Sequence, residues 1–173
     1  MTTKLSLPER HEPYADKYFL RSKEILEAEG INPFVRAQIF IRKGPGVVRG
    51  IDEAISVLHK YGGLRNEQSR VYSVREGSNY SARETLMLVE APIQDIVSLE
   101  TMYLGVISAE TTRATDGHGM DIEKAQRVMG EVVKAAEGRP ISYFGARHWR
   151  WDEDAAIAFA AHKAGATSTS TDI

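Results

Sequence analysis

Residues 143–147, which read Tyr-Phe-Gly-Ala-Arg, place an aromatic ring and a guanidinium close together at the end of an expected short strand. Gly145 allows the backbone to turn sharply there, so that Phe144 and Arg147 would face the mouth of an α/β barrel, where such folds keep their chemistry. A ring that stacks and a cation that binds carboxylate or phosphate suit a flat anionic ligand. The alternative is that Phe144 is a core residue and Arg147 a solvated cap.

Two other places in the chain could also bind a ligand. Tyr18 lies on an expected first helix, residues 16–29, whose apolar face is thin. An exposed tyrosine on such a helix suits a ligand platform or an interface, although simple edge packing explains it as well. Arg42 and Lys43 close an alternating strand beside Gly44, and two cations next to flexible glycines could bind a diphosphate. Charged strand ends are also common without any ligand.

The sequence argues against several other kinds of chemistry. The chain has no cysteine, which excludes disulfides, thiolate metal sites and a cysteine nucleophile. His59 and His118 have no spacing typical of metal ligands, so we predict no metal site formed by the protein and assign no catalytic nucleophile. Glu100 and Glu110 lie on one expected helix roughly 15 Å apart at 1.5 Å per residue. That separation is too large for a catalytic acid/base pair.

Composition points to an ordinary globular protein. The 173 residues are 42% hydrophobic and 27% charged, with a formal net charge of -2. No dense cluster of Lys and Arg is present, so we predict no nucleic-acid partner. The first 13 residues lack the apolar core of a signal peptide, and no apolar run approaches the roughly 20 residues of a membrane span. A cytoplasmic location without membrane attachment is therefore expected.

The pattern of apolar residues divides the chain into three parts. Residues 1–14 are expected to be a flexible lead-in, 15–115 an α+β domain that includes a long helix, and 116–173 the first βα units of an incomplete α/β barrel. Asp16 and Asp121 are expected helix caps. The expected elements are helix 16–29, strand 34–42, helix 52–61, strands 71–74 and 85–90, a helix from Pro92 to near Asp116, a helix from Asp121 to Gly138, and a strand, a helix and a strand after Pro140.

Three segments together make the chain resemble the nicotinate phosphoribosyltransferase family of type II phosphoribosyltransferases, which has nicotinamide and quinolinate relatives. They are Ala-Asp-Lys-Tyr-Phe at 15–19, Leu-Glu-Thr-Met-Tyr-Leu-Gly at 99–105 and Phe-Gly-Ala-Arg at 144–147, and a helix and Gly-Ala-Thr-Ser-Thr-Ser at 165–170 follow. The similarity covers most of 15–173. It implies an α+β N-terminal sandwich domain followed by the start of an irregular α/β (TIM-like) barrel, and thus the N-terminal portion of a longer enzyme.

The resemblance implies roles for the candidate residues. Phe144 would stack on one face of a pyridine ring, and Tyr18, supplied by the partner subunit of a homodimer, would stack on the other. Arg147 would lie beside the carboxylate of the ring or the phosphate of the mononucleotide. Thr169 would offer a hydroxyl to the carboxylate.

The implied reaction is transfer of the phosphoribosyl group from phosphoribosyl pyrophosphate to nicotinate, which gives nicotinate mononucleotide and pyrophosphate in NAD biosynthesis. Mg²⁺ would accompany phosphoribosyl pyrophosphate, and Arg42 with Lys43 would approach the leaving diphosphate. The resemblance also implies ATP as a co-substrate, coupled through a histidine beyond Ile173.

Departures from the family pattern bear on the substrate. The quinolinate branch carries an Arg where this chain has Thr101, which argues against quinolinate. The hydroxyls of 167–171 suit a carboxylate, but Asp172 is close enough to keep nicotinamide open. The alternative outside catalysis is an inactive or split fragment that acts only by association with a partner chain. We expect the 173-residue chain alone to be inactive.

Overall fold

The first part of the chain is built on a three-stranded antiparallel sheet with the strand order β1-β5-β3. The computed structural model describes residues 6–64 and 67–171. In β1 the side chains alternate between a packed face and an exposed face, as expected, with Val35, Ala37 and Ile39 on the packed side. The register pairs Phe34 with Pro92 and Ala37 with Val89. The strands are β1 (Phe34–Phe40), β3 (Arg70–Ser73) and β5 (Thr85–Pro92).

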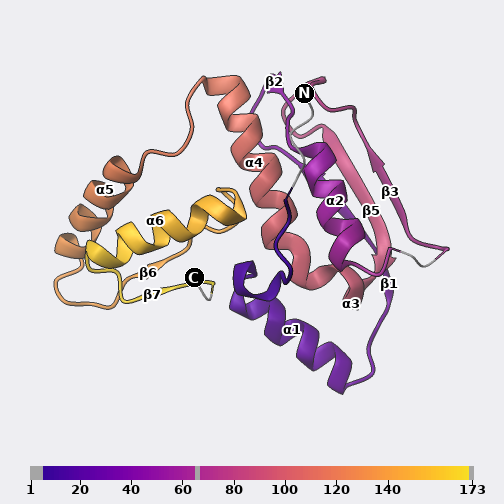
Figure 1. Cartoon of the computed structure of the whole chain (residues 1–173), viewed down its shortest axis with the longest axis horizontal. Helices are drawn as coiled ribbons and strands as arrows, with labels where there is room; N and C mark the ends of the chain where they lie inside the picture. Colours follow the sequence, from indigo (N-terminus) through magenta and orange to yellow (C-terminus); the bar gives the residue numbers. More distant parts are fainter. Residues whose placement is uncertain (1–5, 65–66, 172–173) are drawn as a thin grey trace.

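Two helices cover one face of this sheet and complete a continuous apolar core (Figure 1). They are α2 (Ile51–Tyr61) and α4 (Glu100–Asp116). The carboxylate of Glu76 accepts hydrogen bonds from the backbone N–H groups of Gly50 and Ile51, at 3.0 and 2.8 Å, and so satisfies donors at the start of α2. Burial on several sides of α4 makes it the central helix of the molecule.

The structure corrects one expectation for this part and adds two features that the sequence did not indicate. The long helix expected from Pro92 is broken into α3 (Ile93–Ile96), the 3-10 turn η2 (Val97–Leu99) and α4. The polar loop between β3 and β5 contains β4 (Asn79–Tyr80), which pairs antiparallel with β2 (Gly46–Val47). Glu53 of α2 is buried despite its charge.

Residues 6–14, expected to belong to a flexible lead-in, instead lie against α2 and the turn η2. The Tyr61 hydroxyl donates to the Pro8 carbonyl, and His11 Nε2 lies 2.9 Å from Ser98 Oγ. This stretch contains the 3-10 turn η1 (Glu12–Tyr14), and α1 (Lys17–Ala28) follows it. Residues 1–5 lie outside the described residues.

The second part of the chain forms a smaller lobe beside α4 (Figure 1). Its short strands β6 and β7 pair in parallel, with Ser142 opposite Ser168 and Tyr143 opposite Thr169, and helix α6 connects them. This is one βαβ unit, as expected, and the described residues contain no further barrel strand. Asp121 caps α5 as expected, with Oδ1 accepting from the Lys124 N–H at 2.9 Å. The elements are α5 (Ile122–Ala135), β6 (Ser142–Tyr143), α6 (Trp151–Lys163) and β7 (Ser168–Thr169).

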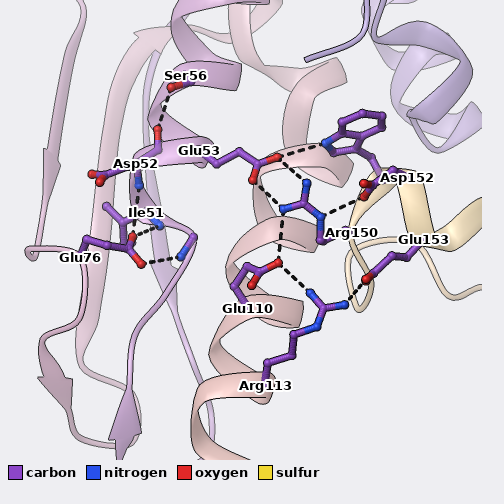
Figure 2. A network of polar contacts seen from close by, with 12 residues as sticks. Ile51, Asp52, Glu53, Ser56, Glu76, Glu110, Arg113, Arg150, Asp152 and Glu153 are labelled. Carbon is purple, nitrogen blue, oxygen red and sulfur yellow. Dashed lines mark hydrogen bonds and ion pairs between the residues drawn. The ribbon is translucent and has the colours of Figure 1, made fainter. Parts of the chain in front are cut away.

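A partly buried ion-pair network joins the two lobes (Figure 2). Arg150, at the start of α6, binds the Glu53 carboxylate through both terminal nitrogens at 2.6 and 3.1 Å, and also approaches Glu110 at 3.3 Å. Arg113 bridges from Glu110 to Glu153. A bidentate pair restrains both the distance and the orientation of its two partners. The network therefore sets the position of α6 against α2 and α4. Among the described helices, none is long and apolar enough to cross a bilayer.

Candidate ligand-binding site

Two aromatic rings lie nearly parallel where the lobes meet. The centroids of Tyr18 and Phe144 are 6.4 Å apart, and their planes differ by 17°. A third ring between two parallel rings needs about 7 Å, twice the contact distance of roughly 3.5 Å between carbon atoms. Both side chains are exposed, Tyr18 by 38% and Phe144 by 54%. The 6.4 Å between the centroids is an upper limit on the gap between the ring planes, so the two rings must move apart to admit a flat ring. The space between them is called here the ring slot.

The ring slot is formed within one chain. Tyr18 comes from the first turn of α1, and Phe144 directly follows β6. Within the single chain, Tyr18 stands opposite Phe144. The expectation that a partner subunit supplies the tyrosine stays a prediction.

The turn that carries Phe144 requires a glycine and contains a strained residue. A Cβ at Gly145 would overlap the Tyr143 side chain, so only glycine allows this turn to lie over that ring. Arg147 has a φ of 75°, a conformation that residues other than glycine adopt only when their surroundings hold them there. The sequence pattern anticipated the sharp turn but gave no sign of the strain at Arg147.

Arg147 is brought to the ring slot as expected, and it lies between two carboxylates. Its Nε is 3.4 Å from Asp16 Oδ2, and its Nη1 is 3.3 Å from Glu100 Oε1. Its guanidinium carbon also lies 5.7 Å from the centroid of the Tyr18 ring, a cation–π distance. An arginine at the rim of an aromatic slot can bind the carboxylate of a ligand held in that slot.

Asp16 has a role that the sequence did not indicate. It was expected to cap α1, but its carboxylate makes no capping hydrogen bond. Instead Oδ2 accepts from the Thr101 hydroxyl at 3.1 Å and from the Tyr18 hydroxyl at 3.4 Å. The residue is fully buried, and Oδ1 has no partner among the described residues. Burial, with Asp16 as a second cause, raises the pKa of Tyr18, so its hydroxyl keeps its proton at neutral pH.

The end of β7 reaches the start of α1. The Lys17 N–H donates to the Ser170 carbonyl at 2.8 Å, and the Ser170 N–H donates to the Tyr143 carbonyl at 3.1 Å. Thr169, a candidate from the sequence, lies opposite Tyr143 in the pair of strands β6 and β7, and its hydroxyl donates to the Thr171 carbonyl at 3.0 Å. Asp172, which kept nicotinamide open, lies outside the described residues.

A buried tyrosine–aspartate pair supports the turn from below. The Tyr143 hydroxyl donates to Asp154 Oδ1 at 2.9 Å. Burial raises the pKa of Asp154 to about 6, with a smaller contribution from the charge of Asp16 and an opposing one from the Tyr143 hydrogen bond. No signal in the sequence identifies this pair, because an aspartate in the first turn of a helix is ordinarily a solvated residue that favours the helix dipole.

Arg42 and Lys43 are not brought to the ring slot. The exposed segment between β1 and β2 that carries them lies at the top of Figure 1, whereas α1 and the ends of β6 and β7 lie low in the view. Their expected contact with a diphosphate stays a prediction. Within residues 6–64 and 67–171 no group of three or more His, Asp or Glu is placed to hold a metal ion, so we assign no metal ligand.

A separate cavity of about 210 Å³ lies between α2 and β3, lined in part by His59, Ser69 and Arg70. It is open and lacks paired aromatic rings, so the ring slot has the more specific chemistry.

The N-terminal part of the chain matches a known family. The family described as "Quinolinate phosphoribosyl transferase, N-terminal domain" matches residues 16–110, more than half of the chain. A comparison with curated proteins found no match.

One solved structure shares this fold, and another shows a weaker similarity. The nicotinate-nucleotide pyrophosphorylase from Pyrococcus furiosus is 24% identical, with a TM-score of 0.51 over 97% of this chain and 41% of that one. The nicotinate-nucleotide pyrophosphorylase from Francisella tularensis is 13% identical, with a TM-score of 0.44 over 94% of this chain and 55% of that one. The chain thus spans about half the length of these structures or less.

Proposed function

Because the chain belongs to the quinolinate phosphoribosyltransferase family, we propose that it takes part in phosphoribosyl transfer from phosphoribosyl pyrophosphate to a pyridine carboxylate, with nicotinate as the substrate. The observation that carries this proposal is the ring slot between Tyr18 and Phe144, with the Arg147 guanidinium at its rim. The sequence resemblance pointed to the nicotinate branch, but the family that matches is the quinolinate one.

In this reaction the pyridine nitrogen forms a bond to C1 of the ribose while the bond from C1 to pyrophosphate breaks. The electron pair of that bond leaves with the pyrophosphate. No nucleophilic side chain is needed, so the contribution of this chain is to hold the ring flat and point its nitrogen at the ribose. The two aromatic faces restrict tilt, and Arg147 restricts rotation about the ring normal by binding the carboxylate.

Nicotinate fits the contacts of the described residues better than quinolinate does. Arg147 supplies one guanidinium to the ring slot, and Asp16 and Glu100 already share it. A pyridine with two carboxylates would bring further negative charge against these two acids. Quinolinate is the second candidate because the family match carries that name. Mg²⁺ accompanies phosphoribosyl pyrophosphate in this proposal, and ATP coupling and a homodimer remain expectations from the resemblance.

An assay with three pyridines tests the proposal. The protein is incubated with phosphoribosyl pyrophosphate, Mg²⁺ and nicotinate, quinolinate or nicotinamide, each with and without ATP, and mononucleotide and pyrophosphate are measured. Product from nicotinate supports the proposal, and the ATP arm tests the coupling. Product from quinolinate alone would favour the second candidate. If no pyridine reacts or binds, the proposed function is wrong for this chain.

A further inference from the structure

Arg147 lies between two carboxylates that differ sharply in exposure. Asp16 is fully buried, whereas the Glu100 side chain is 33% exposed and Arg147 itself is 34% exposed. The two acids also use different nitrogens of the guanidinium, Nε for Asp16 and Nη1 for Glu100. The two contacts therefore use different edges of the guanidinium, so a change at Nη1 does not by itself require the loss of the contact at Nε.

The buried contact is the permanent one. An ionised carboxylate without access to water is strongly disfavoured unless a cation stays with it. Asp16 is further held by Thr101, whose hydroxyl donates to Oδ2 at 3.1 Å and accepts from the Asp16 N–H at 3.0 Å. Since Asp16 cannot turn toward solvent, the Nε edge of Arg147 stays in place.

The contact with Glu100 is the weaker one. The two distances are nearly equal, but here both side chains are partly exposed, and ion pairs between partly exposed groups contribute little to stability. Glu100 stands in the first turn of α4, where the helix dipole favours its charge even without Arg147. Glu100 can therefore release Nη1 to another carboxylate at small cost.

Building on the proposed function, we propose that Glu100 occupies the Nη1 edge of Arg147, to which the carboxylate of the pyridine ligand binds. Glu100 thereby sets the preference between anionic and neutral pyridines. A carboxylate entering the ring slot displaces Glu100 from Nη1 and meets its negative charge. A neutral carboxamide in the same slot meets no such repulsion. Glu100 is thus a specificity-determining residue that lowers affinity for acids relative to amides.

Calorimetric titration of the variant Glu100→Gln tests this inference. The ligands are nicotinate, nicotinamide and benzoate, a flat aromatic carboxylate that lacks the ring nitrogen and cannot react. We expect Glu100→Gln to bind nicotinate and benzoate about three- to tenfold more tightly than the wild type, with affinity for nicotinamide changed less than twofold. The matched control is Glu123→Gln, which removes the same charge from the first turn of α5 and should leave all three affinities unchanged.

The outcomes separate this inference from the proposed function. Equal changes for acids and amide, weaker binding of the acids, or no binding of either acid by Glu100→Gln would overturn the inference. If both acids bind more tightly but no mononucleotide forms, the inference stands and the proposed function fails. Should Glu100→Gln not fold, as judged by circular dichroism, Glu100→Ala is used instead. It removes both the charge and the contact with Nη1, and a gain confined to the two acids is again expected.

Discussion

The two lobes differ in how far each buries its own apolar surface. In the first lobe, three strands and two helices enclose a continuous core that includes Leu58, Leu86 and Met102, none of them exposed. In the second lobe, the buried cluster is small: it consists of Tyr143, Ile157 and three alanines. The described part of α5 buries no residue fully, and Ile122 is among its exposed apolar side chains. The first lobe is therefore stable by its own packing, and the second depends on what holds it to the first.

This contrast explains where the ring slot lies. Its residues come from α1 and from the turn after β6, so the slot exists only while the second lobe is docked. The second lobe is held to the first by the ion pairs of Arg150 and by packing of Trp151 against Tyr14 and the first-lobe core. These contacts therefore influence binding in a way that core residues of the first lobe do not. The following changes test this dependence, in order of expected effect.

Arg150→Met removes the main contact between the lobes. It leaves Glu53 buried without its cation, and breaking a buried pair in this way costs about 3–5 kcal/mol. We expect a loss of this size in the free energy of unfolding measured with urea. The control is Arg127→Met, which removes an exposed pair with Glu131 on α5 and should cost about 0.5 kcal/mol or less. Similar losses for both variants would contradict the view that the joint holds the second lobe.

Asp154 gives the second lobe a dependence on pH. Its pKa is raised to about 6 in the folded protein, from an ordinary value of 3.8, chiefly by burial. Between these two pKa values Asp154 is protonated in the folded state but ionised in the unfolded state. This tighter proton binding stabilises the folded state fully below about pH 4, and the stabilisation is lost as pH rises through 6. We expect the wild type to lose about 2 kcal/mol between pH 4 and pH 7 relative to Asp154→Asn.

Urea unfolding at several pH values measures this difference. The Asn variant keeps an oxygen that can accept from Tyr143, so it serves as a reference without the titration. A difference between the two proteins that stays constant from pH 4 to pH 7 would show that Asp154 titrates normally.

Two helical glycines sharpen the comparison. A Cβ at Gly105 of α4 would overlap the Trp149 carbonyl at the junction of the lobes, whereas a Cβ at Gly130 of α5 would meet nothing within 4 Å. Gly105→Ala should destabilise by about 1–2 kcal/mol, since overpacking outweighs the gain in helix propensity. Gly130→Ala should stabilise by up to about 1 kcal/mol. Thermal unfolding measures both, and a stabilising Gly105→Ala would mean that the lobes are not docked as described.

Local signals in the sequence predicted most elements of the fold. The alternation in 34–40 gave β1, and Asp121 gave the start of α5, because these features depend on neighbours in the sequence. The break at 97–99 was missed, since the apolar pattern continues through it. On the apolar side of α5, Ile122, Val128 and Val132 are exposed. Periodicity shows that a helix has an apolar face but does not show what covers it.

The candidate site was predicted in part. Tyr18, Phe144 and Arg147 were identified from their types and from the resemblance, and the structure brings them together. The two acids that share Arg147 were not anticipated in that role, because Asp16 reads as a helix cap and Glu100 as a solvated residue. Their contacts span 131 and 47 positions of the chain, so no local pattern could indicate them.

Titration of nicotinate into the wild type and Phe144→Ala tests the central claim most directly. The ring slot requires both aromatic faces, and loss of one stacking contact is worth about 1 kcal/mol or more. We therefore predict that Phe144→Ala binds nicotinate about tenfold more weakly than the wild type. The control Phe159→Ala removes an exposed phenylalanine of α6 and should bind like the wild type. Unchanged affinity in Phe144→Ala, or an equal loss in Phe159→Ala, would contradict the ring slot as the ligand site.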